Sequence, residues 1–206
     1  KKFEQDRNLG VVYTWAGVLQ VDGSIQPSIE FSLSGEIYKE ALTQGYVSHM
    51  ITLMVKKECF DKIGRFDTQF NNSDDDDICL RLAKEYHFGL TPEILAIIHN
   101  NHSNKRVTGN VNDLAKMLLK LFSKHKKEIL RVCGNSVMAN HYINCGKYFI
   151  IAYQFKEARK LFSQSFYLAP SLRSAIYYLV SMLPFLGLLI HAARKLKIGY
   201  LIKKII

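Results

Sequence analysis

Four consecutive aspartates, Asp74 to Asp77, are the residues of this chain whose types and spacing most directly suggest chemistry. One carboxylate at the start of a helix caps free backbone N–H groups, and a second complements the helix dipole. Four adjacent carboxylates repel one another, which raises their affinity for protons unless a cation relieves the charge. A carboxylate with raised proton affinity suits a general base that accepts a proton from a hydroxyl. The run therefore predicts either such a base or a solvated acidic cap.

The sequence around the aspartates predicts the helix that positions them. Asp74 to Glu85 carries apolar residues on one side, and the aspartates fall at its N-cap and first turn. Because successive helical positions diverge by about 100°, only one or two of the four carboxylates can face a cleft while the others face water. Arg81 follows Asp77 by one helical turn, so we expect it to pair with an acidic neighbour.

The first hundred residues predict a mixed arrangement of helices and strands. β-branched and aromatic residues between Gly10 and Gln20 precede Asp22-Gly23, which is typical of a hairpin. The other predicted elements are helices over residues 37–43 and 56–63, the second ended by Gly64, and strands over residues 49–55, 88–90 and 94–98, with Thr91-Pro92-Glu93 between the last two.

From Val111 onward the sequence predicts long amphipathic helices without strands. The predicted helices cover residues 111–132, 137–152, 155–168 and 172–196. Small and aromatic residues fall at the spacing of a tetratricopeptide-like helical hairpin. They are Gly146, Tyr153, Ala158, Phe162 and Pro170. An ordinary helical cap on the first module remains an alternative, because such arrays need about three repeats for stability.

Composition restricts the classes of partner. Of the 206 residues, 48% are hydrophobic and 12% aromatic, so the chain can bury a core and is not a disordered protein. Its 28 Lys and Arg exceed its 18 Asp and Glu, and the formal charge is +10. The basic excess concentrates in residues 116–131 and 194–204, beside apolar helices, which favours anionic lipid. No zinc-knuckle spacing or aromatic RNA-binding signature occurs, so we expect no nucleic acid.

The four cysteines and the C-terminal tail bear on the compartment. Cys59, Cys79, Cys133 and Cys145 are widely spaced within apolar patterns, which predicts buried free thiols and the cytosol. Ser174 to Ile190 is uncharged, and basic residues follow from Arg194. An interfacial anchor, a buried core helix and a spanning helix all remain open for this segment. We expect a cytoplasmic protein that is peripheral at the inner face of the plasma membrane.

Four landmarks between Tyr38 and Asn110 resemble, in the same order, the second half of the catalytic domain of inverting family 2 glycosyltransferases, the GT-A type. The landmarks are Val55 to Phe60 after a strand, Ile63 to Asp67, Asp74 to Leu82, and Pro92 to Leu95 leading into a loop with histidines. The resemblance implies an α/β fold: a partial GT-A mixed sheet over residues 1–110, followed by an all-α C-terminal module over residues 111–206.

The third landmark is the most specific of the four. In the family it usually reads Glu-Asp-Trp-Asp, followed by an apolar residue and an Arg-Leu ending. Matching residue by residue places Asp74 at the Glu position and Asp75 at the aspartate that deprotonates the acceptor hydroxyl. Asp76 replaces the usual Trp. The resemblance implies that Asp75 is the base, that Asp74 and Asp77 support it, and that Asp76 and Arg81 lie on the acceptor side.

The resemblance also implies a divalent cation, Mg²⁺ or Mn²⁺, at the nucleotide diphosphate. His99 and His102 lie where the family often has a histidine near the donor phosphates or the metal. A metal-binding D-x-D motif normally ends an apolar strand, whereas residues 69–73 before the acidic run are mostly polar. We therefore expect the main metal ligands in an N-terminal nucleotide-binding half, which has no counterpart before Gly10, and the acidic run on the acceptor side.

The implied function is transfer of a sugar from a nucleotide-sugar donor to an acceptor hydroxyl with inversion. The tail favours a membrane-proximal acceptor, such as a lipid-linked glycan or a cell-surface polysaccharide. As an incomplete enzyme, the chain is expected to be inactive alone. Two alternatives remain: a non-enzymatic helical interaction module whose aspartates are only a solvated cap, and a membrane-surface adaptor that uses the basic tail.

Overall fold

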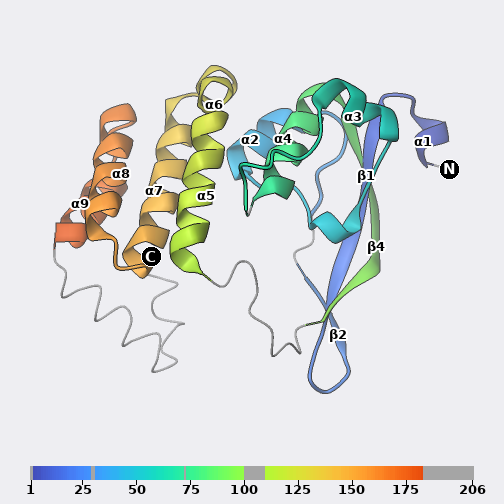
Figure 1. Ribbon diagram of the computed structural model, residues 1–206, viewed down its shortest axis with the longest axis horizontal. Helices are drawn as coiled ribbons and strands as arrows, with labels where there is room; N and C mark the ends of the chain where they lie inside the picture. The colour runs from blue at the N-terminus through green and yellow to red at the C-terminus, as the bar shows by residue number, and fades with distance from the viewer. Residues whose placement is uncertain (1, 29–30, 72, 100–109, 183–206) are drawn as a thin grey trace. The chain divides into compact units, whose positions relative to one another are not determined.

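The computed structural model describes residues 2–28, 31–71, 73–99 and 110–182 (Figure 1). Contacts divide the chain into two compact units, Lys1–Val107 and Thr108–Ile206, and each is described by itself. The first unit holds a mixed sheet with short helices, and the described part of the second consists of helices. The predicted α/β class is therefore confirmed at this coarse level.

Strand β1 (Leu9–Leu19) is the centre of a four-stranded mixed sheet (Figure 1). It pairs antiparallel with β2 (Ile25–Pro27) and with β3 (Leu53–Val55). It pairs in parallel, along its whole length, with β4 (His87–His99). Because parallel strands cannot be joined by a tight turn, the connection between β1 and β4 is long, and it contains β2, β3 and the helices that follow β1.

The connection between β1 and β2 is the hairpin that the sequence predicts. The Asp22 carboxylate accepts hydrogen bonds from the backbone N–H and the hydroxyl of Ser24, at 2.9 and 2.6 Å. Gly23 adopts a φ of 83°, which a residue with a side chain rarely adopts. The Asp-Gly turn chemistry therefore forms as expected.

Strand β4 corrects the prediction of two short strands over residues 88–90 and 94–98. Thr14 pairs with Thr91 and the next residue, Trp15, pairs with Ile94, so Pro92 and Glu93 form a bulge inside one continuous strand. Proline lacks the N–H that a regular ladder needs, and a bulge accommodates it. A turn signal in the sequence therefore marks an irregularity here and not the end of a strand.

The segment before β3 corrects a second prediction, that of a strand over residues 49–55. Met50–Thr52 forms a 3-10 turn, η1, and only Leu53–Val55 is extended. The Thr52 hydroxyl donates to the His49 carbonyl at 2.7 Å, and it also contacts the Ser48 hydroxyl at 2.8 Å. These bonds close a turn where the β-branched residues predicted a strand.

Four helices complete the described part of the first unit. They are α1 (Lys2–Gln5), α2 (Tyr38–Gln44), α3 (Lys57–Ile63) and α4 (Asp74–Glu85). Helix α4 has the predicted bounds, and Ile78, Leu80 and Leu82 are buried on it. Helix α3 ends at Gly64, whose φ of 77° confirms the predicted stop.

The second unit contains α5 (Val111–Lys124), α6 (Lys126–Val132), α7 (Asn135–Ile151), α8 (Phe155–Leu168) and α9 (Leu172–Met182) in its described part. The single helix predicted over residues 111–132 is wrong, because the chain bends at His125. Leu121 and Ile129 are both buried. They would share one face of an unbroken helix too, so the apolar periodicity does not reveal the bend.

Helices α7 and α8 form a closely packed hairpin around Gly146. A Cβ at this position would lie 2.5 Å from the Phe162 ring, so only glycine allows this approach. Ala158 is completely buried, and Tyr153 in the connection has a φ of 61°. Small residues thus lie where the helices meet, and the packing fits both a tetratricopeptide-like hairpin and an ordinary helical cap.

The structure tests the predictions about the cysteines and about the C-terminal tail only in part. All four cysteines are free, and all except the half-buried Cys133 are buried, as predicted. Helix α9 ends at Met182, so the remainder of the helix predicted over residues 172–196 lies outside the described range. Among the helices that are described, none is long and apolar enough to cross a membrane.

Candidate active site

The acidic run forms the first turn of α4, directly after a strained residue. Ser73 precedes the helix in the left-handed region, with a φ of 62°, and it is buried. Its carbonyl accepts the first helical hydrogen bond, from the Asp77 N–H at 3.1 Å. Non-glycine residues with a positive φ are uncommon and often lie at functional sites. The sharp entry places all four carboxylates within one helical turn.

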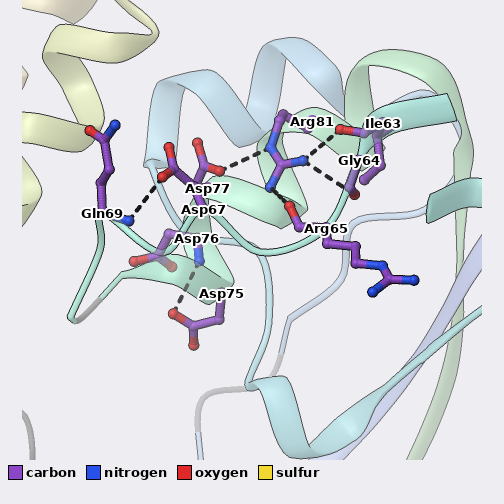
Figure 2. Close-up of polar contacts among 9 residues, drawn as sticks. All are labelled: Ile63, Gly64, Arg65, Asp67, Gln69, Asp75, Asp76, Asp77 and Arg81. Atoms are coloured by element: carbon purple, nitrogen blue, oxygen red, sulfur yellow. Dashed lines mark hydrogen bonds and ion pairs between the residues drawn. The ribbon is translucent and has the colours of Figure 1, made fainter. Parts of the chain in front are cut away.

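Arg81 forms an ion pair with the buried Asp77 carboxylate, which confirms the pairing predicted for Arg81 (Figure 2). The Arg81 Nε donates to the Asp77 carboxylate at 2.9 Å, and the Asp77 side chain is completely inaccessible to water. The guanidinium also donates to the carbonyls of Ile63 and Arg65, at 2.7 and 2.9 Å. Asp77 therefore cannot contact a substrate, and its carboxylate positions α4 against the end of α3.

Asp75 points away from this ion pair, on the opposite side of the helix (Figure 2). Burial raises the pKa of Asp75, and the charge of Asp74 raises it further. The Asp76 N–H, which donates to the Asp75 carboxylate at 3.0 Å, opposes this shift. The expected rise in proton affinity is therefore confirmed, but removal from water contributes more to it than repulsion between the carboxylates does.

Asp76 has the more strongly perturbed carboxyl group. Burial raises its pKa to about 7, the charges of Asp75 and Asp74 act in the same direction, and a hydrogen bond from the Ser73 hydroxyl opposes them. Asp75 and Asp76 are adjacent and interact, so they titrate as a coupled pair. At neutral pH the pair holds a proton for part of the time, which lowers the repulsion within the run.

Tyr46 and His49 face the aspartates from the segment between α2 and η1. Burial raises the pKa of Tyr46 to about 12, and the charges of Asp76 and Asp75 contribute to the rise. Burial lowers the pKa of His49, and the charge of Asp75 opposes this effect. Sequence analysis missed both residues: His49 was predicted to begin a strand, and Tyr46 carried no local signal.

Among the remaining predicted site residues, Asp74 belongs to the same acidic turn, and its charge acts on Asp75 and Asp76. Asp74 is half-buried in the first turn of α4. His99 is the exposed last residue of β4, and His102 lies outside the described range. The Asp67 carboxylate accepts a hydrogen bond from the Gln69 N–H at 3.0 Å, so it fixes the loop before α4.

The described residues do not supply a metal site by themselves. Within the parts of the chain that the structure covers, no three His, Cys, Asp or Glu side chains are grouped so that they could hold a metal ion. The metal-binding side chains among the described residues therefore do not fit a bound cation, and the expected ligands would have to lie outside these residues.

No protein-family model matches the chain, and no curated protein matches it either. The geometry of the aspartates and of the residues that face them therefore carries the functional argument.

Asp76 should make stability depend on pH with a defined sign. Its pKa is about 7 in the folded chain and 3.8 in an exposed carboxyl group, so between these values only the folded state holds the proton. The stability that this bound proton adds to the folded state is fully present below about pH 4 and is lost as the pH rises through 7. Asp76→Asn should therefore be more stabilising at pH 8 than at pH 4, by about 2 to 4 kcal/mol.

Urea denaturation of both proteins at a series of pH values measures this difference. Asp22→Asn is a control of opposite sign, because hydrogen bonds from Ser24 lower the pKa of exposed Asp22. The stability that the Asp22 carboxylate adds to the folded state therefore increases as the pH rises. An Asp76→Asn effect that is equal at pH 4 and pH 8 would show that the Asp76 carboxyl is not held away from water.

Proposed function

We propose that this chain is the acceptor-side portion of an inverting nucleotide-sugar glycosyltransferase. The observation that carries the proposal is Asp75, a half-buried carboxylate whose proton affinity is raised by burial, at the first turn of α4. The resemblance of residues 74–82 to the family motif assigns the role of base to the same position. A general base works best when its pKa is shifted toward the working pH, and the shift of Asp75 has this direction.

In the proposed reaction the acceptor hydroxyl transfers its proton to Asp75. The acceptor oxygen attacks the anomeric carbon from the face opposite the nucleotide diphosphate. The bond between that carbon and the diphosphate oxygen breaks, and the diphosphate leaves with the electron pair, so the configuration inverts. Protonation of Asp76 limits the negative charge beside Asp75. Asp77 and Arg81 hold α4 in place and take no part in proton transfer.

The donor site is also part of the proposal, although most of it would lie outside the described residues. Mg²⁺ or Mn²⁺ would be the counterion of the diphosphate, with ligands outside the described parts of the chain. None of the steps assigned to residues of this chain uses that ion. His102, with His99 as the alternative, would lie near the diphosphate. The acceptor would be a glycan or a lipid-linked sugar, and no nucleic acid takes part.

The proposal is tested with the full-length protein. It is incubated with uridine, guanosine and thymidine diphosphate sugars as donors and with p-nitrophenyl glycosides as acceptors, and the released nucleoside diphosphate is measured. We expect release with at least one donor and a glycosylated product with an inverted anomeric centre. Release of no nucleotide, together with no product, would favour the helical interaction module instead. A product with retained configuration would exclude the mechanism.

Membrane contact is a second part of the proposal, and helix α9 supports it. Leu172, Ile176, Leu179 and Met182 recur at helical spacing, and all four are exposed. An apolar helical face followed in the sequence by Arg194 and several lysines suits an anionic lipid surface. The proposed location is the inner face of the plasma membrane, where this surface would bring the enzyme to a lipid-linked acceptor.

Vesicle binding tests this contact. We expect the double variant Ile176→Ser with Leu179→Ser to bind vesicles of phosphatidylserine and phosphatidylcholine at least roughly tenfold more weakly than the parent chain, because two large apolar side chains are lost. Val21→Ser is the control, since Val21 is equally apolar and 96% exposed but lies in the hairpin of the first unit. Equal loss of binding in both variants, or in neither, would exclude α9 as the contact surface.

A further inference from the structure

Three side chains beside the candidate base form a continuous chain of hydrogen bonds. The Ser28 hydroxyl lies 2.9 Å from Nε2 of His49, and the Tyr46 hydroxyl lies 3.1 Å from Nδ1 of the same ring. Ser28 follows β2, whereas Tyr46 and His49 lie between α2 and η1. All three are only half-buried, so a ligand can reach them. Both ring nitrogens of His49 are therefore occupied by hydroxyl groups from different segments.

Aromatic packing fixes this chain in one arrangement. The ring of Phe31 meets the Tyr46 ring edge to face at 5.0 Å and the His49 ring at 6.0 Å, and the last two rings lie 6.0 Å apart. The Phe31 carbonyl accepts a hydrogen bond from the Trp15 indole at 2.9 Å, which ties the cluster to β1. Edge-to-face contacts at these distances are favourable for aromatic pairs. The Tyr46 hydroxyl is thus preorganised without a ligand.

The nearby carboxylates favour one direction for the protons of the chain. A neutral imidazole donates from one nitrogen and accepts at the other. The charges of Asp75 and Asp76 act on Tyr46, and they favour a phenol proton directed toward them. In that arrangement Nδ1–H of His49 donates to the Tyr46 oxygen, and Nε2 accepts from the Ser28 hydroxyl. Tyr46 then keeps its own proton for an oxygen of a ligand bound beside Asp75.

We infer that Tyr46 binds the sugar acceptor beside Asp75 and that His49, held by Ser28, is a positioning residue for the Tyr46 hydroxyl. The inference rests on the proposed function and names the acceptor-binding residues of the same site. The chemical class of the ligand is a polyhydroxylated ring. The apolar C–H face of such a ring can pack on an aromatic side chain while its hydroxyls bond to the phenol and the carboxylate.

Steady-state kinetics of the full-length protein test the assignment, with the p-nitrophenyl glycoside that serves as acceptor. Tyr46→Phe should raise the KM for this acceptor roughly tenfold, the loss expected for one hydrogen bond, and leave the KM for the donor unchanged. His49→Ala should have a similar effect. His49→Asn should restore part of the loss, because its amide nitrogen can take the position of Nδ1 and still donate toward Tyr46. A merely structural role of His49 would not change the two KM values selectively.

Tyr13→Phe is the matched control. The Tyr13→Phe variant also loses a phenol hydroxyl, which in the parent chain donates to the Leu33 carbonyl at 2.6 Å. Burial raises the pKa of Tyr13 to about 12, as it does for Tyr46. The control should leave the acceptor KM unchanged. Thermal unfolding of each variant shows whether it folds, and calorimetric titration with the acceptor provides a second measurement for a variant that folds but turns over slowly.

The possible outcomes separate this inference from the proposed function. If the parent protein transfers sugar and Tyr46→Phe has an unchanged acceptor KM, the inference is wrong and the proposed function stands. An equal rise for Tyr13→Phe and Tyr46→Phe also overturns it, because the effect would then be structural. If the parent protein transfers no sugar from any donor, the proposed function itself fails.

Discussion

Asp75→Asn is expected to lower the rate of sugar transfer by the full-length protein by at least roughly a hundredfold, the smallest loss typical of a removed general base. Asparagine keeps the size of the side chain and an oxygen that can accept the hydrogen bond from the Asp76 N–H. This bond measures 3.0 Å in the parent chain. It cannot accept the proton of the acceptor hydroxyl. Because the proton moves only in the transition state, kcat and kcat/KM should fall together.

Two further variants make this test specific. Asp61→Asn removes the same charge from an exposed position of α3 and should leave the rate within about twofold of the parent, since an exposed charge there has little effect on the site. Asp76→Asn separates the two members of the coupled pair. A large loss for Asp76→Asn with a small loss for Asp75→Asn would move the base to Asp76. Near-parental rates for both would exclude a general base in this run.

The helix that carries these residues could be predicted closely because its signals are local. An acidic first turn and buried apolar positions along α4 determine its bounds, and the spacing of Asp77 and Arg81 indicates their ion pair. The burial of Asp76 could not be predicted in this way. It depends on packing between segments distant in the sequence, and that packing sets its pKa.

The residues that face the proposed base were missed for a related reason. Thr52 and Ser48 close a turn through their hydroxyl groups, although a β-branched run predicts a strand there. His49 lies within that turn, and Tyr46 precedes it. At Pro92 the sequence predicted a break between two strands. The structure has one strand there, because β4 pairs with β1 on both sides of the bulge. At Pro92 pairing with a distant strand overrode local preference. At residues 48–52 local side-chain hydrogen bonds overrode the strand preference of the β-branched residues.

Arg81→Met is expected to cause the largest loss of stability among the variants considered, about 3 to 5 kcal/mol in the free energy of unfolding. The substitution leaves the Asp77 carboxylate buried without the guanidinium that lies 2.9 Å away. It also removes N–H donors from the carbonyls of Ile63 and Arg65. Arg81→Lys should recover only part of the loss, because an ammonium cannot reproduce the planar fork of donors. Urea denaturation monitored by circular dichroism measures the change.

The control and the double variant distinguish the loss of the ion pair from the loss of packing. Arg65→Met removes an equally large cation from an exposed side chain and should change stability by less than about 0.5 kcal/mol. Combining Arg81→Met with Asp77→Leu removes both charges, and stability should return to within about 2 kcal/mol of the parent. If the double variant is instead as unstable as the sum of its two single changes, the ion pair is not the cause, and the contacts of Arg81 with the carbonyls of Ile63 and Arg65 hold the two helices together.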